Sequence, residues 1–304
     1  MQRHLQNLLL TQFLRLALPL LLAGSSASLN ACTLWAAAGE DASGGTIISK
    51  NRDWKPDHTQ VLKLHRDRKG YAYFGLYAEG NNDPGLKEGV NERGLTVVSA
   101  TVGAVPKATR EAESGKGKLS GALLAGYASC DEVLADQKKL FANRRPTFLM
   151  MADRRKILML EVGLRGRYDV KVIESGAYAH SNHYLEPSLA EFNLRIGTSS
   201  AARLVRISHL LATSPKPFDT ASFAAMSKDQ HDGPDNSLWR TGQGSRTLSS
   251  WIVETAAQGA PKLRVVMENP GKPEQTQTFI LDEQFWETMK AATAPRRTAS
   301  SKAP

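Results

Sequence analysis

A thiol and a group of charged side chains stand near the beginning of the sequence. Cys32 is followed about twenty residues later by Lys50-Asn51-Arg52-Asp53. A nearby cation favours the thiolate form of a cysteine, which is the nucleophilic form. A carboxylate can hold a protonated amine in position through charge-assisted hydrogen bonds. If folding brings these residues together, they could support nucleophilic attack by sulfur.

The segment between them predicts a β-hairpin that would bring them together. Residues 33–38 predict one strand, residues 39–45 are rich in turn formers, and residues 46–49 predict the returning strand. The turn centres near Ala42, and residues equidistant from a turn face each other in an antiparallel pair. Residue 52 is therefore expected opposite Cys32, within about one residue of register. Lys50 and Asp53 should then lie beside the thiol.

Residues 1–31 have the layout of a secretory signal peptide. Arg3 gives a weakly basic start, residues 16–22 are apolar, residues 24–28 are small, and Ala31 directly precedes Cys32. Such signals are cleaved after a small residue. Arg15 interrupts the apolar part, and Leu29 stands at the third position before the cut, where such signals usually have a small residue. We expect cleavage after Ala31 and a mature chain that is periplasmic or secreted.

Cleavage after Ala31 would give Cys32 a free α-amino group. The unperturbed pKa of such a group is about 7.7–8.0, so near neutral pH it could accept the thiol proton. One residue would then supply both nucleophile and base. The alternatives are a small buried cysteine on an edge strand, or a disulfide with Cys130, the second of two cysteines. The surroundings of Cys32 favour a free thiol.

Four segments, in order over most of residues 32 to 282, resemble those of a known family. They are Cys32-Thr33 with Lys50-Asn51-Arg52-Asp53-Trp54, then Asn91-Glu92-Arg93-Gly94-Leu95, Ser181-Asn182-His183-Tyr184 and Arg203-Leu204-Val205-Arg206. Together they resemble the linear amide C–N hydrolases, which are N-terminal-nucleophile hydrolases. This family includes choloylglycine hydrolases, penicillin V acylases and isopenicillin-N acyltransferase-like enzymes.

The resemblance implies an α+β fold of four layers, αββα, and an enzyme that hydrolyses a linear non-peptide amide of an N-acyl substrate through a thioester. We expect no cofactor and no metal. Cys32 corresponds to the nucleophile and Asp53 to the carboxylate that binds the α-amino group. Asn182 corresponds to the amide that stabilises the oxyanion, and Arg203 to an arginine that supports the network.

Two positions depart from the choloylglycine hydrolase pattern. Lys50 stands where that pattern has an arginine, so the charge is kept but the two-pronged geometry is lost. The second oxyanion asparagine falls at Thr101, so a backbone N–H there is expected to serve instead. Both departures favour the acyltransferase-like branch. The sequence leaves open whether water or an amine or thiol acceptor receives the acyl group.

Three alternative functions use the same residues. A metal site at His180 and His183 lacks a third ligand at a convincing spacing. A thiol protease with His183 as base would place its cysteine at a helix N-terminus, whereas Cys32 lies on a predicted strand. Residues 29–32 partly match a lipoprotein signal, which would make the chain a membrane-anchored binding protein, although Asn30 weakens that match.

The remaining pattern predicts two sheets with helices packed outside them. Strands are expected at residues 61–64, 71–78, 95–102, 147–152, 156–162, 168–173, 263–268 and 276–281, and helices at 119–128, 132–141, 201–211, 218–226 and 282–289. Residues 103–118 and 228–244 are polar loops of a length that often borders a site. Trp35 and Trp54 could either line an apolar acyl pocket or pack in the core.

Composition narrows the choice of partners. The 304 residues are 41% hydrophobic with a net charge of +9, and no basic stripe is interleaved with aromatic residues, which argues against nucleic-acid binding. Beyond the leader no apolar run reaches the ~18 residues of a membrane span. We expect one catalytic domain at residues 32–290, a disordered tail at 291–304, a small-molecule N-acyl substrate and, as an option, a homo-oligomer.

Overall fold

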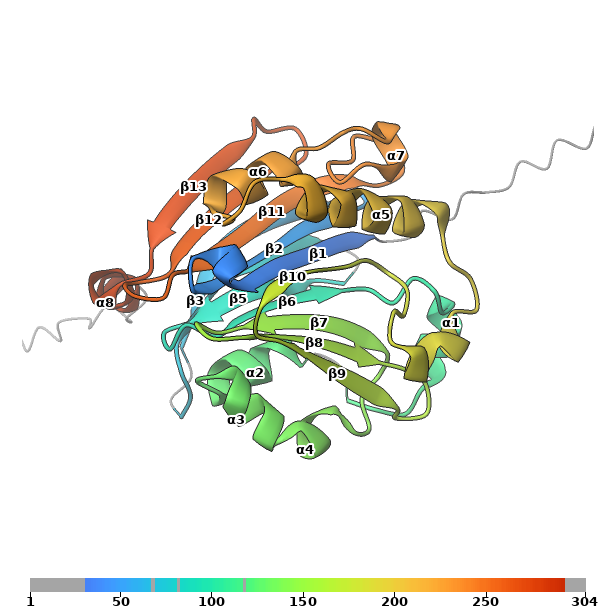
Figure 1. Cartoon of the computed structure of the whole chain (residues 1–304), viewed down its shortest axis with the longest axis horizontal. Helices are drawn as coiled ribbons and strands as arrows, with labels where there is room; N and C mark the ends of the chain where they lie inside the picture. Colours follow the sequence, from blue (N-terminus) through green and yellow to red (C-terminus); the bar gives the residue numbers. More distant parts are fainter. Residues whose placement is uncertain (1–30, 67–68, 81–82, 117–118, 293–304) are drawn as a thin grey trace, which may run out of the picture.

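The first hairpin sets the position of Cys32. The computed structural model describes residues 31–66, 69–80, 83–116 and 119–292 (Figure 1). Strand β1 (Cys32–Gly39) pairs antiparallel with β2 (Gly45–Trp54), through the short 3-10 helix η1 (Glu40–Ala42). Cys32 lies opposite Arg52, so the predicted register is confirmed to the residue.

The hairpin belongs to a six-stranded antiparallel sheet in the order β10-β1-β2-β11-β12-β13. The other strands are β10 (Gly176–His180), β11 (Arg246–Thr255), β12 (Lys262–Met267) and β13 (Gln275–Ile280). Strands β10 and β11 are absent from the predicted elements. Strand β11 has both faces covered, and Ser249 and Ser250 interrupt its apolar run, so it lacks the alternating pattern of a half-exposed strand.

The second sheet has seven strands in chain order from β3 to β9. They are β3 (His58–His65), β4 (Tyr73–Gly80), β5 (Gly85–Asn91), β6 (Thr96–Ala100), β7 (Thr147–Ala152), β8 (Ile157–Val162) and β9 (Tyr168–Ile173). Strand β5 is also missing from the predicted elements. It carries Lys87 and Glu88, both buried, and a sequence pattern assigns such charges to a surface loop.

The two sheets face each other across the main core, and helices cover both outer faces (Figure 1). Helices α5 (Thr198–Thr213) and α6 (Thr220–Ser227) pack on the six-stranded sheet. Helices α2 (Ser120–Gly126), α3 (Cys130–Ala135) and α4 (Gln137–Phe141) pack on the seven-stranded sheet. The remaining helices are α1 (Lys107–Ala112), η2 (Pro187–Phe192), α7 (Gly233–Asn236) and α8 (Glu283–Ala292). The four-layer αββα architecture is confirmed.

The period of two along β1 decides which way each side chain points. Cys32 and Leu34 belong to the core between the sheets, whereas Trp35 belongs to the core beneath α5 and α6. The same alternation on β2 places Lys50 and Arg52 on the inter-sheet face, and Asp53 on the helix-covered face.

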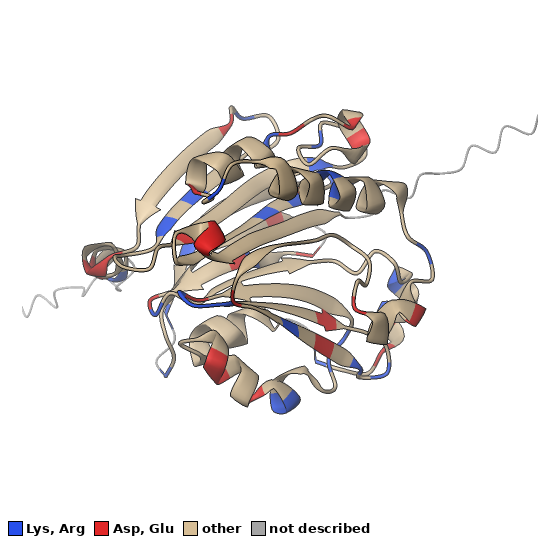
Figure 2. Ribbon diagram, viewed as in Figure 1, with Lys and Arg blue, Asp and Glu red and all other residues tan. Residues whose placement is uncertain are grey.

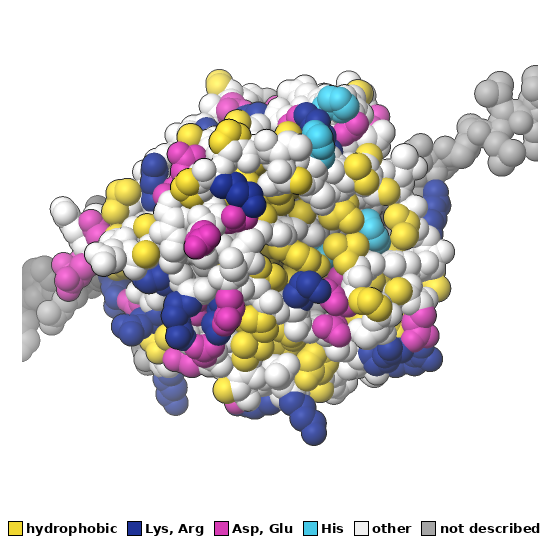
Figure 3. All heavy atoms as spheres, in the orientation of Figure 1, with side chains coloured by type: hydrophobic (Ala, Val, Ile, Leu, Met, Phe, Trp, Pro, Cys, Tyr) yellow, Lys and Arg dark blue, Asp and Glu magenta, His cyan; other side chains and the backbone are white. Residues whose placement is uncertain are grey.

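Two sequence-based expectations concern residues outside the described ranges. The predicted signal peptide lies there except for Ala31, and so does the predicted tail beyond Ala292, where α8 ends. Within the described ranges, no helix combines the length and apolar character needed to cross a membrane. Charged residues are spread over the helices, strands and loops in Figure 2, and acidic and basic side chains are mixed on the face in Figure 3.

Candidate active site

Cys32 lies at the first position of β1, between two cavities. Its side chain is 5% exposed and lines a cavity of about 230 Å³ between the sheets, here called the thiol cavity. A larger cavity of about 600 Å³, here called the Ala31 cavity, is lined by Ala31, Asn182 and Arg203. Cys32 itself lines the thiol cavity, whereas Ala31 and Asn182, the neighbours of its backbone nitrogen, line the Ala31 cavity.

Asn182 is held in place from every side. Its Oδ1 accepts from the Cys32 nitrogen at 3.2 Å, and its Nδ2 donates to the Thr101 carbonyl at 2.8 Å. Its own carbonyl accepts from the N–H groups of Gly103 and Ala104 at 2.8 and 3.0 Å. One hydrogen of Nδ2 remains for another acceptor. The sequence-predicted pair of Asn182 and Thr101 is brought together beside Cys32, and Thr101 lines the thiol cavity.

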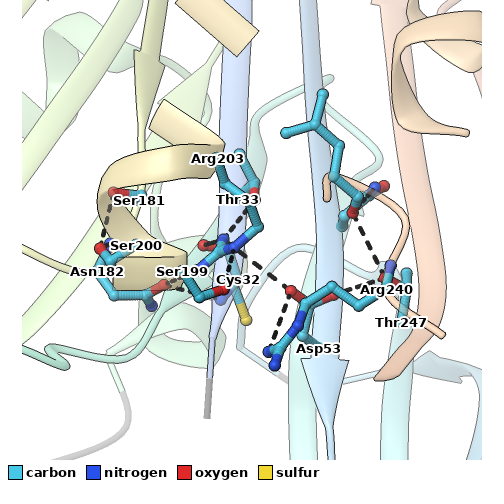
Figure 4. Close-up of polar contacts among 12 residues, drawn as sticks. Cys32, Thr33, Asp53, Ser181, Asn182, Ser199, Ser200, Arg203, Arg240 and Thr247 are labelled. Carbon is cyan, nitrogen blue, oxygen red and sulfur yellow. Dashed lines mark hydrogen bonds and ion pairs between the residues drawn. The ribbon is translucent and has the colours of Figure 1, made fainter. Parts of the chain in front are cut away.

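Arg203 of α5 joins these groups (Figure 4). Its Nη1 donates to the Cys32 carbonyl at 2.8 Å and to Thr33 Oγ1 at 2.5 Å, and its Nη2 donates to Asn182 Oδ1 at 2.8 Å. The side chain is fully buried, and this burial lowers the pKa of its guanidinium, although Asp53 opposes the shift. Arg203 thus fixes both the start of β1 and the Asn182 amide.

Asp53 provides a buried carboxylate on the neighbouring strand (Figure 4). Its Oδ1 accepts from Thr247 Oγ1 at 2.7 Å, while its Oδ2 lies 4.0 Å from Arg203 Nη1 and 3.9 Å from Arg240 Nη1. Within the described ranges Oδ2 has no hydrogen-bond partner. Burial raises the pKa of Asp53, against the two arginines and Thr247. An ammonium group beside Oδ2 would complete this site.

Lys50 was expected to stabilise the thiolate of Cys32, but its ammonium group binds other partners. It lines the thiol cavity, as the hairpin register requires. Its Nζ, however, bonds to Glu88 Oε2 at 2.6 Å and to the Lys87 carbonyl at 3.0 Å. Both charges of this pair are at most 1% exposed. The charge of Lys50 is therefore matched by Glu88 and is not available chiefly to the thiol.

Arg52 is the cation directly across from Cys32. It shares the inter-sheet face with the thiol, is 1% exposed, and donates through Nη2 to His58 Nδ1 at 2.8 Å. Its Nη1 is buried with no hydrogen-bond partner among the described residues. The register argument placed Arg52 opposite Cys32, but the family pattern drew attention to Lys50 instead.

The histidines near Asn182 bind protein groups. His180 Nε2 lies 2.8 Å from Glu161 Oε1, and both side chains are fully buried. His183 Nδ1 lies 2.8 Å from Ser200 Oγ, which also accepts from the Asn182 N–H at 3.0 Å. His183 therefore supports Asn182 indirectly. The described residues include no group of three or more His, Cys, Asp or Glu side chains that could hold a metal.

The two tryptophans have different surroundings. Trp54 lines the thiol cavity and stacks on His58. Trp35 is fully buried beneath the helices and contacts Phe223, so it is a core residue and does not line the cavity. Both cysteines are free, and Cys130, the first residue of α3, is buried in the core between the outer helices and the seven-stranded sheet.

Arg240 and Thr247 have no counterpart among the predicted site residues. Thr247 pairs with Asp53 across β11 and β2, and Arg240 donates its N–H to Thr247 Oγ1 at 2.8 Å. The predicted loop 228–244 does border the site, because it contributes Arg240 to the Ala31 cavity. A strand prediction at 246–255 would have been the one signal leading to Thr247.

Comparisons with known proteins show the family and the fold of this chain. The family described as acyl-coenzyme A:6-aminopenicillanic acid acyl-transferase matches residues 40–272. A solved variant of conjugated bile acid hydrolase from Clostridium perfringens is 14% identical, with a TM-score of 0.52, over 82% of this chain and 92% of that chain. The Caenorhabditis elegans ortholog of N-acylethanolamine-hydrolyzing acid amidase is 11% identical, with a TM-score of 0.53, over 74% and 93%. The curated proteins gave no significant match.

Proposed function

Because the chain belongs to the acyl-coenzyme A:6-aminopenicillanic acid acyl-transferase family, we propose that it cleaves a linear N-acyl amide with Cys32 as an N-terminal nucleophile. The membership confirms the predicted family type and the prediction of an enzyme that acts on carbon–nitrogen bonds of linear amides. The cysteine mechanism and the mature N-terminus are our proposal.

One observation carries the proposal: an acceptor bonds to the nitrogen of Cys32, and a buried carboxylate residue bonds to the residue before it. Asn182 Oδ1 already accepts from this nitrogen, and the Asp53 N–H donates to the Ala31 carbonyl at 3.0 Å, so the carboxylate residue lies beside the bond that processing would cut. The unpartnered Oδ2 of Asp53 is suited to an ammonium. We infer that export removes residues 1–31 and that the mature enzyme is periplasmic or secreted.

The reaction then follows from these contacts. The thiol of Cys32 gives its proton to the α-amino group and attacks the carbonyl carbon. The oxyanion is bound by the remaining hydrogen of Asn182 Nδ2 and by the N–H at Thr101, at about 3–4 kcal/mol for a donor of this kind. When the C–N bond breaks, the α-ammonium returns the proton to the leaving amine and a thioester remains on Cys32. Water, deprotonated by the same amine, releases the acid.

Acyl transfer is the second candidate, and the family description favours it. An amine or thiol acceptor would enter in place of water and attack the same thioester. Competition assays, in which purified mature protein receives an N-acyl substrate with and without such acceptors, separate the two outcomes by their products.

The base is tested by adding one residue before Cys32. The added residue turns the amine into an amide, which is not basic, and loss of a general base typically lowers rates by about 10²–10⁴. We expect the extended protein and Cys32→Ser to lose activity by orders of magnitude, while His183→Ala retains much of it. Acylation rates are measured by burst kinetics and by the mass of the trapped thioester, with folding checked by circular dichroism.

Two results would overturn the proposal. An active extended protein together with a folded but inactive His183→Ala variant would make Cys32 part of a Cys–His site. A lipid-modified N-terminus at Cys32, seen in the intact mass of exported protein, would make the chain a membrane-anchored protein. N-terminal sequencing should instead begin at an unmodified Cys32.

A further inference from the structure

The thiol cavity is lined by an excess of cations. Its charged lining comprises one carboxylate, Asp83, and seven basic residues: Lys50, Arg52, Lys87, Arg110, Lys116, Arg144 and Arg145. Two of the basic residues are matched, because Lys50 pairs with Glu88 and Lys87 pairs with Asp83, both at 2.6 Å. The five other basic residues would form no favourable electrostatic contact with an apolar acyl chain.

Among the residues that the structure describes, the four arginines of the cavity form no close ion pair, although Asp83 favours the charged forms of Arg52 and Arg110 from a greater distance. In the described ranges none of Arg52, Arg110, Arg144 and Arg145 has a carboxylate within 4.0 Å, although the nitrogens of two of them bond to carbonyls. Arg110 donates through Nε to the Val105 carbonyl at 3.1 Å, and Arg144 donates to the Leu140 carbonyl at 2.6 Å. These bonds use one donor of each guanidinium and leave the others for an anion.

Arg52 makes this a built site and not only a basic surface. Its side chain is 1% exposed, it lines the cavity opposite the nucleophile, and its Nη1 has no hydrogen-bond partner in the described residues. Leaving a charged donor buried and unbonded is costly, so the arrangement is complete only with an acceptor. A planar guanidinium suits a carboxylate, which can accept from it in bidentate geometry.

The position of the α-amino group decides which part of a substrate enters this cavity. The leaving amine must meet the proton carried by the Cys32 nitrogen, and that nitrogen bonds to Asn182, on the wall of the Ala31 cavity. The leaving group therefore lies toward the Ala31 cavity. The acyl group, attached to sulfur, extends into the thiol cavity. Its volume of about 230 Å³ is below the ~300–1,000 Å³ of pockets for drug-sized ligands, which favours a short acyl group.

We propose that the preferred acyl group is short and carries a carboxylate at its far end, bound by Arg52 and Arg110 in the thiol cavity. This inference rests on the proposed function, since it takes Cys32 as the acylated residue. It predicts selectivity against the neutral acyl chains of the same length, because these would leave Arg52 desolvated and unbonded.

The test compares three amides that share one fluorogenic leaving amine: glutaryl, its half-amide glutaramyl and pentanoyl. Mature wild-type protein should cleave the glutaryl amide with a kcat/KM about tenfold or more above the other two, as expected for loss of a charge-assisted hydrogen bond. Arg110→Gln should reduce this ratio by about tenfold. Arg93→Gln, an exposed arginine on the β5–β6 turn, is the matched control and should keep the ratio.

Binding of the product acids keeps the inference separate from the proposed function. Calorimetry on the same proteins compares glutarate, glutaramate and pentanoate, which differ only at the end far from Cys32. Tighter binding of glutarate than of the other two acids, weakened by Arg110→Gln, supports the anion site. If no amide is cleaved but glutarate still binds in this way, the proposed function is wrong and the anion site stands. Equal binding of the three acids, or equal cleavage of the three amides, overturns the anion site while leaving the hydrolase intact.

Discussion

Five charged side chains around Cys32, namely Lys50, Arg52, Asp53, Glu88 and Arg203, are each at most 1% exposed. Removing an ion from water costs several kcal/mol, which must be offset by partners. Lys50 and Glu88 offset each other, and Arg203 bonds to oxygens of four residues. Asp53 Oδ2 and Arg52 Nη1 keep no hydrogen bond within the described residues. The proposed α-amino group would donate a hydrogen bond to Asp53 Oδ2, and the proposed acyl carboxylate would accept one from Arg52 Nη1.

Lys50→Ala tests the assignment of its charge. Removing one partner of a buried ion pair typically costs about 3–5 kcal/mol, because Glu88 is left uncompensated. We expect a loss of unfolding free energy of this size in urea titrations. Lys63→Ala is the control, since the Lys63–Glu79 pair is about half exposed and such pairs contribute about 0–1 kcal/mol. If wild type and Lys50→Ala were equally stable but the variant acylated more slowly, the charge of Lys50 would act mainly on the Cys32 thiol.

His183 predicts a pH dependence of stability. Burial lowers its pKa from the usual value near 6.5, with further contributions from His180 and Arg203. The unfolded chain therefore takes up this proton first as the pH falls. Its stabilising contribution is complete above about pH 6.5 and is lost as the pH falls through the folded-state pKa.

His183→Asn should flatten this dependence, because the replacement cannot be protonated. The measurement is the urea midpoint between about pH 7 and 5, for wild type and variant. His209→Asn, at an exposed position of α5, controls for the substitution itself. Parallel curves for wild type and His183→Asn would show that another group causes the acid sensitivity.

At the level of elements, the β1–β2 hairpin and its pairing with β11 define the site. Gly45 begins β2 where that strand passes β11 closely: an added Cβ would lie 2.1 Å from the Thr255 carbonyl oxygen. Backbone atoms cannot move away cheaply. The absence of a side chain at Gly45 therefore allows the central strands of the six-stranded sheet to pair.

Gly45→Ala should accordingly destabilise the protein by about 1–3 kcal/mol or more, as overpacked cores do. It should also reduce activity, because a displaced hairpin misplaces Cys32. Gly126→Ala is the matched control: among the described residues, no heavy atom outside its own helix lies within 4 Å of its added Cβ, and it should change stability by about 1 kcal/mol or less. Thermal unfolding of both variants measures the difference, and similar melting temperatures would contradict the steric argument.

Local geometry made part of this site predictable. A turn centred near Ala42 was sufficient to place Cys32 opposite Arg52. The pairing of Asp53 with Thr247 was not predictable, since the partner is nearly 200 residues away on a strand interrupted by serines. Those serines are satisfied inside the fold, Ser250 by Ser227 and Ser249 by Glu88. Burial of polar residues on both faces removes the alternation on which strand prediction depends.

At the scale of the whole molecule, the two thiols lie on different sides of the seven-stranded sheet. Cys32 belongs to the core between the sheets and lines the thiol cavity, whereas Cys130 begins the outer helix α3 and belongs to the core between the helices and the seven-stranded sheet. Burial raises the pKa of the Cys130 thiol, and its Sγ contacts the Lys156 carbonyl at 3.6 Å. The thiolate of Cys130 is therefore scarce in the folded protein.

Iodoacetamide should consequently alkylate Cys32 in the folded protein and Cys130 only after denaturation. Peptide mass spectrometry after a short labelling pulse, with and without urea, measures both sites. Cys130→Ala should leave labelling of the folded protein unchanged, and Cys32→Ala should abolish it. Rapid modification of Cys130 without denaturant would mean that the helical layer opens readily.

The order of the six-stranded sheet has a consequence for biosynthesis. Strand β2 lies between β1 and β11, so Asp53, which lies next to the start of β1, meets its partner Thr247 only once residue 247 has been made. Pairings this distant in sequence form slowly and late in folding. A growing or truncated chain that stops before β11 therefore carries the cysteine but no assembled site, and the proposed chemistry can begin only when this strand, in the last fifth of the 304 residues, has joined the first hairpin.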